Sequence, residues 1–175
     1  MKKYVPNSLF FTAAVIALIV LLRFLNWLPL SLEQGIARKY SSIEEVKAKL
    51  NIKKIYAPSY FPENFAWPPY EIIAQTKPFT SVTMKFRRTD RMSSTLVICQ
   101  SDTAAPLTDS FPRMAQLKES ITYPLKGRQA LLDVGICRDK EPCSSMTWLE
   151  GRYRIAVAVE SPPFELIKIS ESMLH

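Results

Sequence analysis

The first strong pattern in the chain is an apolar run close to its N-terminus. Residues 9–22 hold no charged side chain, and apolar residues resume after Arg23. Together these residues are long enough for a helix of about 30 Å, the thickness of the hydrocarbon core of a bilayer. Arg23 can extend its charge to the interface, where Trp27 also belongs. The pattern therefore predicts a transmembrane anchor at residues 8–30, which follows a cytoplasmic tail at residues 1–7.

A cleaved signal peptide is the alternative, because the first apolar run alone has the length of a signal-peptide core. No A-x-A-like cleavage site follows the run, and no cysteine is placed for lipid attachment, so a retained anchor is favoured. Lys2 and Lys3 favour a cytoplasmic N-terminus, although Arg38 and Lys39 weaken this bias. We therefore expect a single-pass protein of the cell membrane with its C-terminal domain outside the cytoplasm.

Beyond the apolar run, the spacing of apolar residues is helical only for a short stretch. Residues 31–51 are predicted as a connector that ends in a short helix. Ser42 and Glu45 fit a capping box, in which the serine caps the helix and the glutamate reaches back to the backbone. The apolar positions on one face of this helix are Ile43, Val46 and Leu50.

From Glu71 onward, apolar and polar residues alternate with a period of two, which predicts strands. The clearest alternation is in residues 81–88, and residues 94–100 follow as the return strand of an antiparallel hairpin. Residues 101–120 are predicted as a loop with a short helix at residues 114–118. The remaining predicted strands are residues 52–57, 129–137, 145–149 and 153–160, with a turn at Glu150 and Gly151 between the last two.

The chain closes with a helical pattern, for which Ser161 is a suitable N-cap and Pro162 fits the first helical position. The apolar stripe of this helix consists of Leu166, Ile169 and Met173, with Ile167 and Leu174 beside them. The predicted fold class is α+β, with an N-terminal transmembrane helix followed by one mainly antiparallel sheet. A short N-terminal helix and a C-terminal helix packed across the sheet complete an extracytoplasmic domain at residues 52–175.

Between the short helix and the strands that begin at Glu71, residues 57–70 combine four prolines with aromatic side chains. Prolines exclude a regular helix, so we expect an ordered, extended segment that packs on the domain. The alternative interpretation is an aromatic binding groove. Its residues would be Tyr60, Phe61, Phe65, Trp67 and Tyr70.

The charge of the predicted domain is moderate. Three of the 23 basic residues precede residue 31, whereas all 16 acidic residues follow it, so residues 31–175 carry a net charge of +4. This value suits a domain near an anionic surface but does not indicate nucleic-acid binding. The partners expected from composition are therefore the membrane and another envelope protein, and no nucleic acid.

A local cluster of basic residues surrounds the tip of the predicted hairpin. Its members are Lys85, Arg87, Arg88 and Arg91. The cluster can contact lipid headgroups or an acidic partner. The alternative is a solvated turn in which Asp90 neutralises part of the charge, and this alternative is favoured.

Two cysteines, Cys137 and Cys143, bracket a polar, turn-like insert. A hairpin there can bring the two sulfur atoms together, and a disulfide would suit an oxidising compartment. Two free thiols are the alternative. Cys99 lies in an apolar run and is expected to be a core residue.

The sequence offers no evident catalytic machinery. The only histidine is His175, so the serine side chains lack an evident general base and a zinc site is not expected. Four glycines are too few for a glycine-rich phosphate cradle. We therefore predict a protein that is not an enzyme, with no catalytic residues, no metal and no cofactor.

Two stretches of the chain resemble a family of uncharacterised bacterial extracytoplasmic domains found behind transmembrane anchors. Residues 55–65, IYAPSYFPENF, resemble the P-x-Y-L-P-x-G-F opening of these domains. Residues 147–155 and 165–173 resemble the closing pattern, in which a tryptophan strand and a tyrosine strand lead to a helix. Some members are anti-sigma-factor-like or sporulation-associated membrane proteins. The resemblance implies an extracytoplasmic domain at residues 52–174 and supplies no catalytic residues.

The function predicted from the sequence is that of a membrane-anchored, extracytoplasmic binding or sensory domain that acts through protein–protein contacts. An accessory subunit of a membrane assembly, associated through its anchor helix, is the first alternative. An envelope hydrolase is the second.

Overall fold

The computed structural model describes residues 14–23, 37–90, 95–103 and 114–174. The chain forms two compact units, Met1–Gly35 and Ile36–His175. Residues 14–23 of the first unit are helical. The second unit is built on a β-sheet and contains all the candidate site residues named above.

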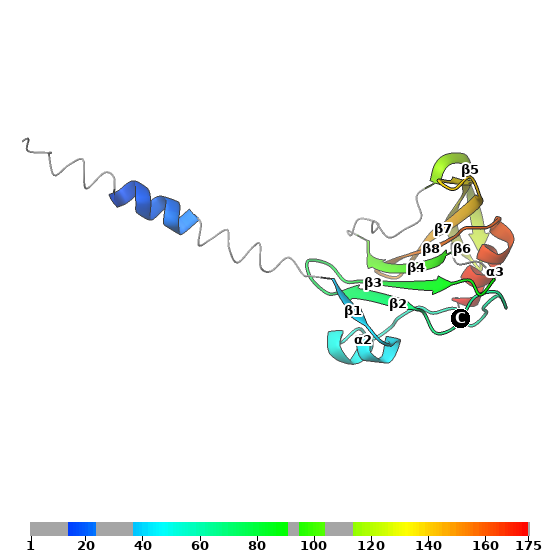
Figure 1. Ribbon diagram of the computed structural model, residues 1–175, viewed down its shortest axis with the longest axis horizontal. Helices are drawn as coiled ribbons and strands as arrows, with labels where there is room; N and C mark the ends of the chain where they lie inside the picture. Colours follow the sequence, from blue (N-terminus) through cyan, green and yellow to red (C-terminus); the bar gives the residue numbers. More distant parts are fainter. Residues whose placement is uncertain (1–13, 24–36, 91–94, 104–113, 175) are drawn as a thin grey trace, which may run out of the picture. The chain divides into compact units, whose positions relative to one another are not determined.

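Eight strands of the second unit form one antiparallel sheet in the order β1-β2-β3-β4-β8-β7-β6-β5 (Figure 1). The strands are β1 (Arg38–Tyr40), β2 (Glu71–Gln75), β3 (Ser81–Arg87), β4 (Thr95–Asp102), β5 (Met114–Leu125), β6 (Arg128–Cys137), β7 (Pro142–Glu150) and β8 (Tyr153–Val159). After β4 the chain crosses to the far edge of the sheet at β5 and returns strand by strand to β8. The last strand, β8, therefore pairs with β4 in the middle of the sheet.

Two tight turns set the register of the returning half. Lys126 and Gly127 join β5 to β6 with φ angles of 44° and 81°. Two consecutive residues with positive φ form the hairpin turn whose twist matches that of the flanking strands, and glycine adopts it without steric cost. Gly151 has a φ of 59° in the turn between β7 and β8, where the sequence predicted a turn.

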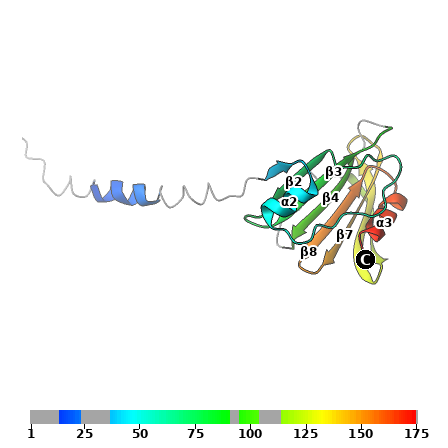
Figure 2. The ribbon, with the colours of Figure 1, turned by 90° about the horizontal axis from the view of Figure 1, so that it is seen from below.

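The core lies on one face of this sheet. One row of directly opposed residues crosses six strands at its centre: Leu132, Met146, Val157, Ile98, Met84 and Ile72. Helices α2 (Ile43–Leu50) and α3 (Pro163–Ser172) cover this face together with the irregular segment 51–70 (Figure 2). Val46 from α2 and the stripe residues Leu166 and Ile169 from α3 are buried completely. The prediction that the C-terminal helix lies across the sheet is confirmed.

Several local predictions are confirmed as well. The predicted strands at residues 81–88, 94–100, 129–137, 145–149 and 153–160 correspond to β3, β4, β6, β7 and β8. Ser42 caps α2, because its Oγ accepts the amide of Glu45 at 3.1 Å. The Glu45 carboxylate reaches back to the amide of Ser41 at 2.8 Å, one residue before the position that the capping box predicted.

The predicted strand at residues 52–57 is wrong. Its backbone bonds to the buried side chain of Gln100 and not to a neighbouring strand. Gln100 Oε1 accepts the amide of Tyr56 at 2.9 Å, and Gln100 Nε2 donates to the carbonyl of Lys54 at 2.9 Å. One amide side chain therefore satisfies the backbone groups that would otherwise need a strand partner.

The predicted short helix at residues 114–118 is wrong, because strand β5 begins at Met114. Residues 104–113 of the predicted loop lie outside the described residues. The register against β6 shifts between Met114 and Gln116 and again between Leu117 and Glu119. Each bulge inserts a residue and reverses the alternation of faces.

The start of α3 differs by one residue from the prediction. Pro162 is the N-cap and Pro163 begins the helix, with no side-chain capping bond. Ser161 does not cap the helix, because its hydroxyl donates to the carbonyl of Pro162 at 3.3 Å.

The predicted fold class, α+β with an N-terminal transmembrane helix, is wrong. The second unit is mostly β, and its helices are short. In the part of the chain that the structure describes, no helix is long and apolar enough to cross a membrane. The helical residues that the structure describes here, 14–23, extend over about 15 Å. The rest of the predicted anchor, residues 8–13 and 24–30, lies outside the described residues.

Candidate functional site

The proline-aromatic segment, residues 57–70, is held at the C-terminal end of β3. The amide of Ala66 donates to the carbonyl of Arg87, and the amide of Tyr70 donates to the carbonyl of Lys85, both at 3.0 Å. The segment is therefore ordered and packed on the domain, as predicted, but it is not extended throughout, because the amide of Phe65 donates to the carbonyl of Pro62 at 3.0 Å in a turn. These backbone bonds fix the positions from which its aromatic side chains project.

The centre of the segment is an aromatic cluster that is buried on one side and exposed on the other. The ring centroids of Phe61 and Trp67 lie 5.4 Å apart, and Trp67 stacks on Phe86 at 5.8 Å with an interplanar angle of 22°. Phe86 is buried completely, whereas Trp67 is 53 % exposed. The indole therefore rests on the core and presents its remaining surface to solvent.

The beginning of the segment is tied to α3. The hydroxyl of Tyr60 donates to the Glu165 carboxylate at 2.9 Å, and the hydroxyl of Ser59 donates to the carbonyl of Ser172 at 3.0 Å. The hydrogen bond to Glu165 raises the pKa of Tyr60 above its ordinary value. Phe164, which precedes Glu165 in the first turn of α3, is 75 % exposed.

At the other end of the segment, Arg87 lies over the ring of Tyr70, with 4.7 Å between the guanidinium carbon and the ring centroid. Tyr70 is 49 % exposed. Such a cation–π contact orders both side chains at the surface. We refer to the exposed residues Tyr60, Trp67, Tyr70, Arg87 and Phe164 as the aromatic surface.

The structure divides the predicted aromatic residues. It brings Phe61 and Trp67 together and leaves Tyr60 and Tyr70 exposed at the two ends of the segment. Phe65 is buried and belongs to the hydrophobic core. Sequence analysis missed Phe164, although the signal was present. At 100° per residue, Phe164 points about 200° away from Leu166 and hence away from the buried stripe.

Two of the four residues of the predicted basic cluster are paired with acidic neighbours. Lys85 Nζ lies 2.7 Å from the Glu71 carboxylate. Arg88 forms a bidentate pair with Asp90, at 2.8 Å from Nε and 2.6 Å from Nη2. Arg91 lies outside the described residues. The interpretation of a solvated turn with Asp90 as a local partner thus fits Arg88, whereas Arg87 is exposed and belongs to the aromatic surface.

Cys137 and Cys143 are buried on neighbouring strands and are free thiols in this structure. A hydrogen bond joins the two side chains, and burial is the largest cause that raises the pKa of both thiols. Cys143 is opposite Gly135 in the register of β6 and β7, so the two cysteines are diagonal neighbours. The disulfide stays a prediction.

Among residues 14–23, 37–90, 95–103 and 114–174, no three side chains of His, Cys, Asp or Glu are grouped so that they could hold a metal ion. Comparison with protein-family models, curated proteins and solved structures finds no match to this chain. The resemblance to extracytoplasmic domains therefore stays a prediction.

Proposed function

We propose that the second unit is a non-enzymatic binding domain that recognises another protein through the aromatic surface. The observation that supports this proposal most directly is Trp67, which is 53 % exposed and stacked on the buried ring of Phe86. An exposed indole that is already held by the core loses little conformational freedom on binding.

The composition of the surface supports the same proposal. Tryptophan, tyrosine and arginine are the residues that most often dominate the energy of protein–protein interfaces. The surface contains Trp67, two tyrosines and Arg87, and Phe164 adds an apolar ring that is 75 % exposed. The partner is expected to be another envelope protein, following the extracytoplasmic location predicted from the sequence.

Site-specific crosslinking in intact cells tests this proposal. A photoreactive phenylalanine is placed at Phe164 in one variant and at Leu149 in another. Leu149, on β7, is 60 % exposed and lies outside the aromatic surface, so it is a matched control. We expect a crosslinked protein from position 164 and none from position 149.

A second substitution measures the contribution of the indole. Trp67→Ala removes a candidate anchor residue, for which losses of about 2 kcal/mol or more are typical, so affinity for the captured protein should fall about 30-fold. Leu149→Ala should leave the affinity unchanged. The proposal fails if both positions give the same products or if Trp67→Ala binds like the unchanged protein.

A further inference from the structure

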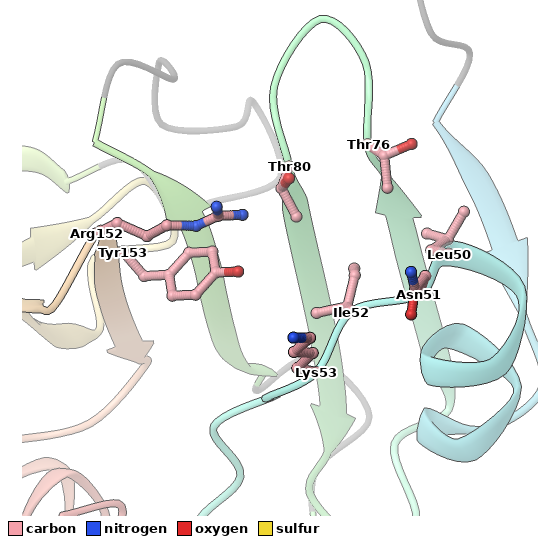
Figure 3. A pocket seen from close by; sticks show the side chains of 8 residues that line it. All are labelled: Leu50, Asn51, Ile52, Lys53, Thr76, Thr80, Arg152 and Tyr153. Carbon is pink, nitrogen blue, oxygen red and sulfur yellow. The ribbon is translucent and has the colours of Figure 1, made fainter.

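A separate pocket of about 530 Å³ lies at the opposite end of β3 from the aromatic surface. Three parts of the chain form it: the segment after α2, the turn between β2 and β3, and the turn between β7 and β8. Its volume lies within the range of small-molecule sites. The lining residues are Leu50, Asn51, Ile52, Lys53, Thr76, Thr80, Arg152 and Tyr153 (Figure 3).

The pocket combines apolar and polar walls. Ile52 is buried and joins the hydrophobic core, so one wall is fixed by the packing of the domain. Asn51 ends α2 in a left-handed conformation, with φ of 52°, and this turn directs the chain across the sheet. Figure 3 shows Arg152 and Tyr153 pointing from the opposite side toward Thr80 and Ile52.

The charge balance of the pocket is positive. Asp102 accepts the amide of Thr80 at 2.8 Å, and its other carboxylate oxygen lies 3.6 Å from Nε of Arg152. This long contact is weaker than a direct hydrogen bond, and the Arg152 side chain remains 69 % exposed. Lys53 has no ion-pair partner within residues 37–90, 95–103 and 114–174. Two cations, Lys53 and Arg152, thus line the pocket, and the Asp102 carboxylate near Arg152 is committed to the backbone of a turn.

We propose that this pocket binds a small organic anion. The anionic head, a carboxylate or a phosphate, would contact Lys53 and Arg152, and an apolar body would lie against Leu50 and Ile52. The cationic fork of Arg152 can donate two parallel hydrogen bonds to either head. This proposal does not depend on the aromatic surface, because the two sites share no residue.

Titration of the ¹⁵N-labelled full-length protein with benzoate and with phenyl phosphate tests the proposal. Amide resonances of residues 50–53, 76, 77, 79, 80, 152 and 153 should shift and saturate with at least one of these anions. The anion that binds more tightly identifies the head group. Benzamide has the same ring without the charge and inorganic phosphate has the charge without the ring, so both should bind at least about tenfold more weakly. Equal binding of either one would refute the corresponding half of the proposal.

A matched pair of double variants controls for general charge effects. Lys53→Gln with Arg152→Gln should weaken binding about tenfold or more. Arg138→Gln with Lys140→Gln removes the same charge from the turn at the other end of β7 and should leave binding unchanged. Each spectrum also reports whether the variant is folded, and the single variants Lys53→Gln and Arg152→Gln replace a double variant that is not. Absence of saturable shifts, or equal losses in both double variants, would overturn the proposal.

Discussion

Two substitutions in helix α3, at positions 164 and 166, compare the loss of a buried side chain with the loss of an exposed one. Leu166 is buried completely, whereas Phe164 is 75 % exposed. Leu166→Ala removes apolar volume between α3 and the strands β7 and β8 on which the helix packs. The lost transfer free energy is about 2 kcal/mol, and the cavity left behind raises the total cost to about 3–4 kcal/mol. Phe164→Ala should change the free energy of unfolding by less than about 0.5 kcal/mol.

Urea unfolding of the full-length protein, followed by tryptophan fluorescence, measures both effects. With a denaturant slope of about 2 kcal/mol per molar, Leu166→Ala should lower the midpoint by about 1.5–2 M. Phe164→Ala should leave the midpoint within about 0.3 M of the unchanged protein. A shift below about 0.5 M for Leu166→Ala, or equal shifts for both variants, would show that α3 is not packed on the sheet as described.

Two further predictions concern titratable groups. Burial raises the pKa of Glu160 above its ordinary value of 4.5, although its carboxylate accepts the amide of Thr95 at 3.0 Å. Because the pKa of Glu160 is raised in the folded state, its favourable contribution to the free energy of unfolding is complete below pH 4.5. This contribution is lost as the pH rises through the folded-state pKa. Glu160→Gln should therefore increase stability at pH 7 relative to its effect at pH 4, and urea titrations with the same difference at both pH values would contradict this. For Cys137 and Cys143, burial raises the pKa of both thiols, so alkylation at pH 7 should be slow in the native protein and fast in urea. If mass spectrometry in urea without reductant finds both residues unmodified, the two cysteines form the disulfide that the sequence also allows.

Much of the sheet could be predicted from the sequence because its central strands are locally consistent. Residues 81–88 alternate cleanly. In β8, larger apolar residues alternate with the small residues Ala156 and Ala158, and both faces of the strand are buried. By contrast, β5 has two bulges that interrupt the period of two. An edge strand with such shifts has no simple sequence pattern, so it was mistaken for a loop with a short helix.

The sequence by itself determined the strands with regular alternation, the cap of α2, the turn at Gly151 and the buried stripe of α3, because each depends on neighbours within a few residues. It also identified the proline-aromatic segment as ordered and non-helical, although not the turn within it. Only the tertiary structure decided which of its rings are buried, since Phe65 and Trp67 differ in their contacts with distant strands. The pocket was decided in the same way, because Lys53 and Arg152 are about 100 residues apart in sequence and line one pocket only through the packing of the segment after α2 against the sheet.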